Sequence, residues 1–136
     1  ANTISGTGRV FQTGSGTLTL TGDNSYALGT LLSAGNLVVG SNTALGTGLL
    51  TTLGGTLQLG IETTPGVSAG PITLGNRIEL LGNTIVDLVG DTAGVNAFTG
   101  LYDSAGTSAT LNGVISGTGR MTFVGAGTLT LNGNNT

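Results

Sequence analysis

The sequence predicts an all-β protein built as a parallel β-helix (β-solenoid), in which each coil of the chain stacks on the previous one. Short runs of alternating apolar and polar residues, closed by glycine or asparagine, follow one another along the whole chain. Similar strand starts recur about every 20 residues, a period typical of β-helices. Glycine is 27 of 136 residues, which disfavours any long helix.

The first half of the chain contains three pairs of predicted strands. Each pair alternates apolar and polar residues, with Leu, Ile and Val expected to face inward, and ends at glycine, which suits tight corners. A polar cluster at 23–25 predicts a turn, and the sequence at 41–48 predicts a looser corner. The predicted strands are 9–14, 17–22, 30–35, 36–40, 49–55 and 56–60.

The second half repeats this pattern with two interruptions. A loop is expected at 61–70, followed by strands at 71–76, 77–83 and 84–90. Equivalent coil starts are assigned to Arg9, Thr30, Leu49 and Pro71, which are nearly evenly spaced along the chain. A chain of this length with about 20 residues per coil predicts roughly five to seven coils.

The chain also repeats its own opening. The stretch 4–25 returns as 115–136, with 14 identities in 22 positions. We therefore treat 1–136 as a single solenoid segment in which 4–25 and 115–136 are equivalent repeat starts. The segment 91–110 departs from the pattern, and we expect an irregular coil or a protruding loop there.

Composition excludes several functional classes. The chain has three Lys plus Arg and six Asp plus Glu, a net charge of −3, so it lacks the basic cluster that nucleic-acid binding requires. No apolar run reaches the length of a membrane span, and we expect no membrane insertion by this segment. The chain has no cysteine, so no disulfide framework is available. We expect a piece of a longer protein or a processed mature chain.

The segment Gly14 to Tyr26 resembles the passenger-associated strand repeat of bacterial autotransporters, and so do the segments 33–40 and 42–48. The segments 111–119 and 125–131 resemble the start of a further unit of this repeat. This resemblance implies a right-handed parallel β-helix in a large secreted protein at the bacterial cell surface. It implies no catalytic residues, and it does not extend to 91–110.

Few residues of the chain are candidates for catalysis or metal binding. Polysaccharide-cleaving β-helices need clustered carboxylates, for which Asp87 and Asp91 are the nearest pair, and turn-forming carboxylates are the better interpretation. Without His, Lys or Cys, we expect no enzyme, no metal and no cofactor. A calcium-binding glycine repeat is absent, and the Thr17-x-Thr19 pattern of an ice-binding face is not repeated in the following strands.

The expected function is therefore structural: a non-catalytic module of an extracellular bacterial surface protein or fibre that extends and associates with itself. A solenoid exposes a strand edge at each end unless it is capped, and neither end has a capping pattern. The residues assigned to self-association are Ile4, Arg9, Thr17, Thr19, Arg120, Thr128 and Thr130. The alternative is an adhesin that displays a recognition loop at 91–110, with Phe98, Tyr102 and Asp103 contacting surface glycans. A glycan-binding groove lined by Tyr26, Phe98 and Tyr102 is also considered, and packing or loop anchoring is the better interpretation of these three aromatic residues.

Overall fold

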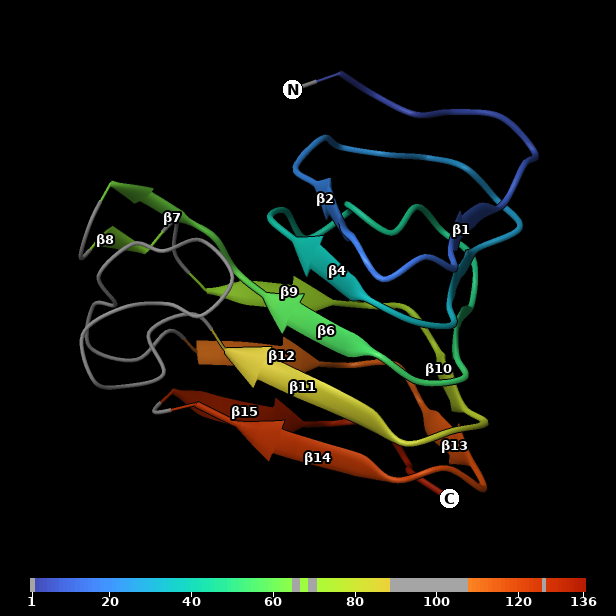
Figure 1. Cartoon of the computed structure of the whole chain (residues 1–136), viewed down its shortest axis with the longest axis vertical. Helices are drawn as coiled ribbons and strands as arrows, with labels where there is room; N and C mark the ends of the chain where they lie inside the picture. The colour runs from blue at the N-terminus through green and yellow to red at the C-terminus, as the bar shows by residue number, and fades with distance from the viewer. Residues whose placement is uncertain (1, 65–66, 69–70, 89–107, 126) are drawn as a thin grey trace.

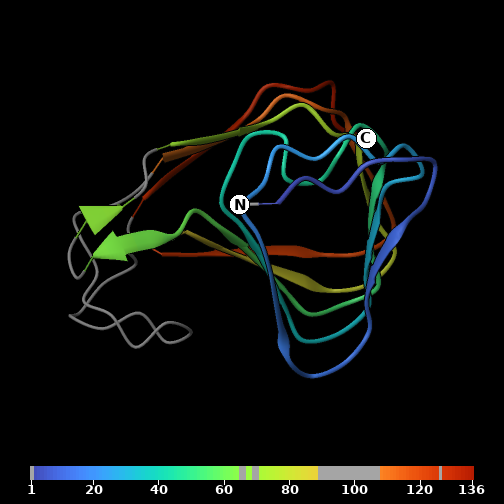
Figure 2. The same cartoon turned by 90° about the horizontal axis from the view of Figure 1, so that it is seen from above.

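The computed structural model describes residues 2–64, 67–68, 71–88, 108–125 and 127–136, and in this part of the chain all regular structure is β. Three parallel sheets surround one core, so the predicted all-β class is confirmed and the stacked arrangement is consistent with a β-helix (Figure 1). Viewed along the stack, the chain follows a roughly three-sided path (Figure 2). Each side carries one sheet.

The first two sheets have five strands each. The first sheet contains β1 (Val10–Gln12), β3 (Thr30–Leu32), β5 (Leu50–Thr52), β10 (Ile78–Leu80) and β13 (Ile115–Gly117). The second contains β2 (Thr17–Leu20), β4 (Asn36–Val39), β6 (Thr56–Leu59), β11 (Thr84–Leu88) and β14 (Met121–Val124). The third sheet contains only β9 (Ile72–Leu74), β12 (Ser108–Leu111) and β15 (Thr128–Leu131).

The strand register corrects one predicted coil start. Val10 pairs with Thr30 and Thr30 with Leu50, so the first two coils are equal in length and close to the predicted period. Leu50 then pairs with Ile78, and Ile78 with Ile115, so each of the next two coils is longer than the one before it. Pro71 is therefore not a coil start. The strand that follows it belongs to the third sheet, because extra residues lengthen this part of the coil.

Two segments differ from their predicted form. The expected loop 61–70 contains an antiparallel hairpin of β7 (Glu62–Thr64) and β8 (Val67–Ser68), which projects from the stack in Figure 1. Strand β12 begins at Ser108, so the last residues of the expected irregular segment 91–110 form a regular strand. Residues 91–107 lie outside the described residues.

The core consists of stacked rows of aliphatic side chains. Along the second sheet, Leu37, Leu57 and Val86 occupy one register position and are buried. Inward residues of the first and third sheets, such as Leu50 and Leu111, complete the same core cluster. Such rows bury apolar area continuously along the stack, which is the main stabilising contribution available to a chain with so few charges.

Glycine permits the corner between the first and second sheets. Gly35 and Gly55 have φ angles of 71° and 82°, a left-handed conformation that strains other residues. A Cβ at Gly35 would also meet the backbone carbonyl oxygens of Gly14 and Gly16 in the neighbouring coil. Close coil-to-coil contact at this corner therefore requires glycine.

The two copies of the sequence repeat share local hydrogen bonds. The Ile4 N–H donates to Asn24 Oδ1 at 2.8 Å, and the Ile115 N–H donates to Asn135 Oδ1 at 2.9 Å. The copies nevertheless lie on different sides of the stack. The strand 17–20 belongs to the second sheet, whereas 128–131 belongs to the third. The second copy is thus placed one side further along the coil than the first.

Candidate functional site

The N-terminal end of the stack gathers four of the residues predicted for self-association. Thr17 and Thr19 face outward on β2, the last strand of the second sheet at this end, and both are exposed. Arg9 precedes β1 and its Nε donates to the Leu28 carbonyl oxygen at 2.9 Å. Ile4 lies on the third side, where it is exposed and its N–H bonds to Asn24.

The C-terminal end gathers the other three. Thr128 and Thr130 face outward on β15, and Arg120 precedes β14; all three side chains are exposed. Figure 1 shows β14 and β15 at the end of the stack opposite β1 and β2. The predicted residues therefore form two groups at the two ends. Whether the ends bind one another remains a prediction.

Sequence reasoning missed the most informative residues of the C-terminal end. Phe123 and Leu131 continue inward rows, yet they are 40% and 45% exposed. Their partners one coil earlier, Val86 and Leu111, are each 1% exposed. The same alternation that predicted the strands places positions 123 and 131 on the inner side, so this signal was available. The core is thus uncovered at the last described coil.

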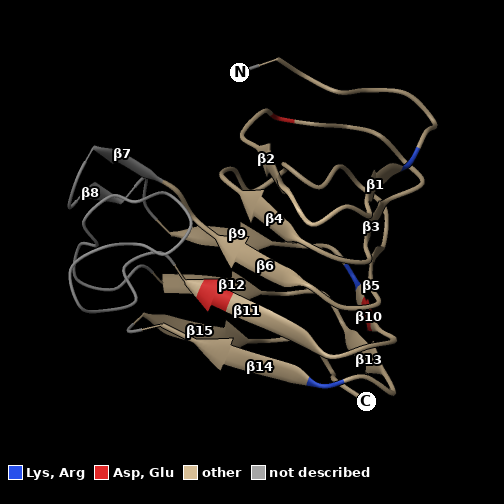
Figure 3. Cartoon of the chain, viewed as in Figure 1, with Lys and Arg blue, Asp and Glu red and all other residues tan. Residues whose placement is uncertain are grey.

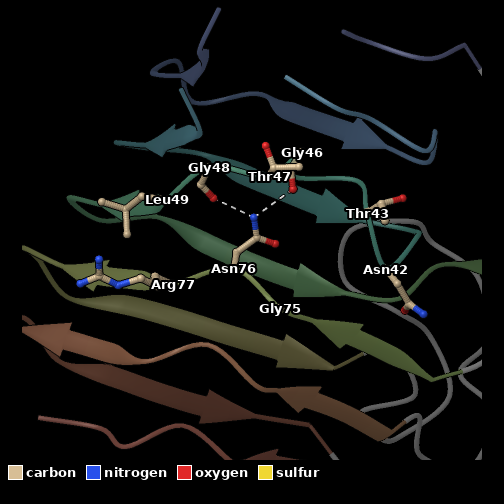
Figure 4. Close-up of a pocket in the computed structure, with 9 residues that line it drawn as sticks. All are labelled: Asn42, Thr43, Gly46, Thr47, Gly48, Leu49, Gly75, Asn76 and Arg77. Atoms are coloured by element: carbon tan, nitrogen blue, oxygen red, sulfur yellow. Dashed lines mark hydrogen bonds between the residues drawn. The ribbon is translucent and has the colours of Figure 1, made fainter. Parts of the chain in front are cut away.

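A groove lies on the third side, between residues 42–49 and residues 75–77, which follow strand β9. The turn at 41–46 closes with hydrogen bonds from the Ala44 N–H to Ser41 O and from the Gly46 N–H to Thr43 O. A turn of this kind cannot form a ladder with the next coil. The groove between them has a volume of about 490 Å³ and is lined by Asn42, Thr43, Gly46, Thr47, Gly48, Leu49, Gly75, Asn76 and Arg77 (Figure 4).

Two asparagines replace the missing strand pairing beside this groove. Asn42 Oδ1 accepts a hydrogen bond from the Thr73 N–H of β9 at 2.8 Å. Asn76 Nδ2 donates to Gly46 O at 3.1 Å and to Gly48 O at 2.8 Å. Side-chain amides can donate and accept at once, so they satisfy backbone groups that would otherwise be unpaired.

The structure describes one of the three aromatic residues for which the sequence left two interpretations open. Tyr26 is buried; its hydroxyl lies 2.6 Å from Thr30 Oγ1 and donates to Ala44 O at 3.4 Å. Tyr26 is a packing residue, so the alternative in which it lines a glycan groove is wrong. Phe98, Tyr102 and Asp103 lie outside the described residues, and their predicted role stays a prediction.

Charged residues are few and spread over the stack (Figure 3). Asp87 faces outward on β11 yet is buried, as is Gln58 beside it on β6. A buried carboxylate is poorly placed to meet a polymeric substrate, and Asp91 lies outside the described residues. Among the described residues, no group of three or more His, Cys, Asp or Glu side chains is placed to hold a metal ion. No helix in that part of the chain is long and apolar enough to cross a membrane.

Comparisons with known proteins agree with the strand pattern. The family of the passenger-associated-transport-repeat matches residues 10–39 and 121–136. The chain is 35% identical over 133 residues, 96% of its length, to the adhesin BmaC autotransporter of Brucella suis biovar 1 (strain 1330). It spans 3% of the length of that protein. No solved structure matches the chain.

The matched segments are those that the sequence repeat had paired. Position 121 corresponds to position 10 in that repeat, and each begins a matched segment. In the structure, one segment begins on the first sheet and the other on the second. The predicted resemblance to the passenger-associated repeat of autotransporters is therefore confirmed for residues 10–39 and 121–136.

Proposed function

We propose that this chain is a non-catalytic structural segment of an autotransporter passenger at the bacterial cell surface, which extends the protein and associates end to end. Its fold would be a right-handed β-helix of five to seven coils, with the period of about 20 residues in each coil that lacks insertions. The repeat match and the similarity to an autotransporter adhesin support the location and the passenger class.

The observation that carries the proposal is the continuation of the inward rows into the last described strands, β14 and β15. Phe123 and Leu131 occupy inward rows but keep close to half of their surface exposed. A further coil placed on β14 and β15 would bury both side chains and pair the free strand edges. Burying apolar area is favourable by about 25 cal/mol per Å², so an added coil is stabilised by the contacts that hold the described coils together.

The N-terminal end offers the complementary surface. Strands β1 and β2 are terminal in their sheets, and few charges lie near them (Figure 3). Low charge removes the repulsion that usually protects strand edges from pairing. The β1–β2 end of one copy against the β14–β15 end of another is the contact that we propose for the isolated chain.

Sedimentation velocity over a concentration series tests this contact. We expect the isolated chain to form linear oligomers, and Leu131→Glu to weaken their formation by at least about tenfold, because a carboxylate would be buried without a partner. Leu53→Glu is the matched control, since Leu53 is equally exposed at 47% but lies at a corner in the middle of the stack. Oligomers that respond equally to both variants, or a monomer up to about 100 µM, would contradict the proposal.

The second candidate function is adhesion through the segment 91–107. The relative is named an adhesin, and this segment departs from the repeat pattern. Because β12 starts at Ser108 and pairs with β9, the deletion that tests it must end at residue 107. Loss of cell or glycan binding with unchanged sedimentation would favour the adhesin. Unchanged binding would leave the structural role as the better account.

A further inference from the structure

We propose that the groove between residues 42–49 and residues 75–77 binds an acidic saccharide, with the sugar carboxylate at Arg77 and sugar hydroxyls at Asn42 and Thr47. This inference deepens the adhesin candidate and rests on its premise that the domain contacts glycans. It is independent of the segment 91–107 and of end-to-end association.

The first argument is the origin of the groove. The first and second sheets run through these coils without interruption, whereas on the third side a turn faces a strand. Asn42 and Asn76 bridge this gap through three hydrogen bonds to the backbone. The bridges hold the two walls apart at a set distance, so the groove is built into the coil and does not depend on a mobile side chain.

The second argument is the set of polar groups left for a ligand. Asn42 uses its oxygen for the Thr73 N–H, which leaves its two amide hydrogens as donors. Asn76 uses its Nδ2 for two carbonyl oxygens, which leaves its Oδ1 as an acceptor. The Thr47 hydroxyl is exposed and can donate or accept. Neutral donors beside acceptors match the hydroxyl groups of a sugar.

The third argument is charge. Arg77 is exposed and makes no ion pair with the described residues, and its guanidinium presents a fork of donors that fits a carboxylate. Figure 4 shows Arg77 and Asn42 at opposite ends of the groove, with Asn76 between them. The Asp23 carboxylate accepts a hydrogen bond from Thr43 Oγ1 at 2.8 Å, at the Asn42 end. Asp23 therefore disfavours an anion at the Asn42 end of the groove.

These features select the class of ligand. The lining has no aromatic ring on which a neutral sugar could stack, so neutral saccharides gain little there. A hexuronate combines hydroxyls with one carboxylate and fits a groove of about 490 Å³. At the efficiency usual for ligands of this size, a Kd on the order of 1 mM is expected for one unit, and a polymer would bind more tightly through repeated contacts.

The test is a titration of the 15N-labelled wild-type chain, followed by amide shifts. The probes are glucuronate, glucose and acetate. We expect glucuronate to shift the amides of Thr47, Gly48 and Gly75, and to bind about tenfold more tightly than glucose or acetate. Added salt should weaken the binding, because the Arg77 contact is exposed to solvent. Shifts confined to other regions, or equal binding of acetate and glucuronate, would overturn the proposal.

Two substitutions locate the contacts. Arg77→Gln should reduce glucuronate affinity about tenfold, while the matched exposed arginine variant Arg120→Gln should leave it unchanged. Asn42→Asp keeps the oxygen that accepts the Thr73 N–H but replaces the donor with a negative charge, so it should abolish binding. Wild-type affinity in Arg77→Gln would refute the assignment. Sedimentation of Arg77→Gln and Asn42→Asp should match the wild type, because neither residue lies in the two end groups, and this separates the result from the test of end-to-end association.

Discussion

Leu111 and Leu131 occupy the same inward row of the third sheet, one coil apart, and their truncation to alanine measures where the covered core ends. Leu111 is 1% exposed, and Leu131 is 45% exposed. Leu111→Ala removes a fully enclosed side chain and leaves a cavity, so we expect a loss of about 2–5 kcal/mol in the free energy of unfolding. Leu131→Ala removes a side chain that is little more than half covered and leaves no closed cavity. Its expected cost is about 1 kcal/mol.

The assay is urea unfolding followed by circular dichroism, at a concentration where sedimentation shows a monomer. With a slope of about 2 kcal/mol per molar urea, Leu111→Ala should lower the midpoint by about 1–2.5 M and Leu131→Ala by about 0.5 M. Equal shifts in the monomer would refute the view that the core is uncovered at Leu131. The proposed association adds one expectation. As protein concentration rises, Leu131→Ala should lower the free energy of unfolding by a larger amount, because a neighbouring copy then covers that position.

Three further predictions concern single residues of the first coils. Asn24→Ala should lower the free energy of unfolding, measured with urea, by about 2–3 kcal/mol, because this buried amide bonds to the backbone of both neighbouring coils. The exposed Asn135 makes one such bond, so Asn135→Ala should lower it by about 1 kcal/mol. Gly46→Ala should cost at least about 1–3 kcal/mol, because φ is 63° and the new Cβ would clash with the Tyr26 carbonyl oxygen and meet the Tyr26 ring at 3.1 Å. Gly75→Ala, with open space around it, should be near neutral by the same measurement. Burial raises the pKa of the Tyr26 phenol above its ordinary value of 10.0, so the folded state holds its proton more tightly and stability should fall as pH rises above 10. Tyr26→Phe should reduce that loss in unfolding curves measured at pH 9 to 11; an unchanged pH dependence would show that another group causes it.

Much of the strand pattern could be predicted because it depends on nearest neighbours. In 36–40 and 56–60, alternation and a closing glycine predicted the strands, and the register confirms them; Leu37 and Leu57 are their buried partners in one inward row. The strand at 71–76 was also predicted, but its side of the stack was not. Strand formation needs only local sequence, whereas the side depends on how many residues the preceding coil contains.

The candidate sites are the two end groups and the groove on the third side, and they differ in what the sequence could predict. The residues predicted for self-association fall into two groups because they lie near the two ends of the given sequence, and their binding to one another remains a prediction. The groove could not be predicted, because its two walls, 42–49 and 75–77, are distant in the sequence and come together only when coils of unequal form are stacked. Nothing in either local sequence distinguishes these asparagines from those of ordinary turns.

The sequence by itself determined that the chain forms short strands, that glycine occupies the tight corners, and that aliphatic rows fill one core. These follow from a strand period of two and from backbone sterics, which act only between near neighbours in the chain. Only the tertiary structure decided that residues 17–20 and 128–131, alike in sequence, lie on different sides of the stack. The three sides offer a strand nearly equal packing, so the length of the intervening segments, and not the residues of the strand, determines which side it joins.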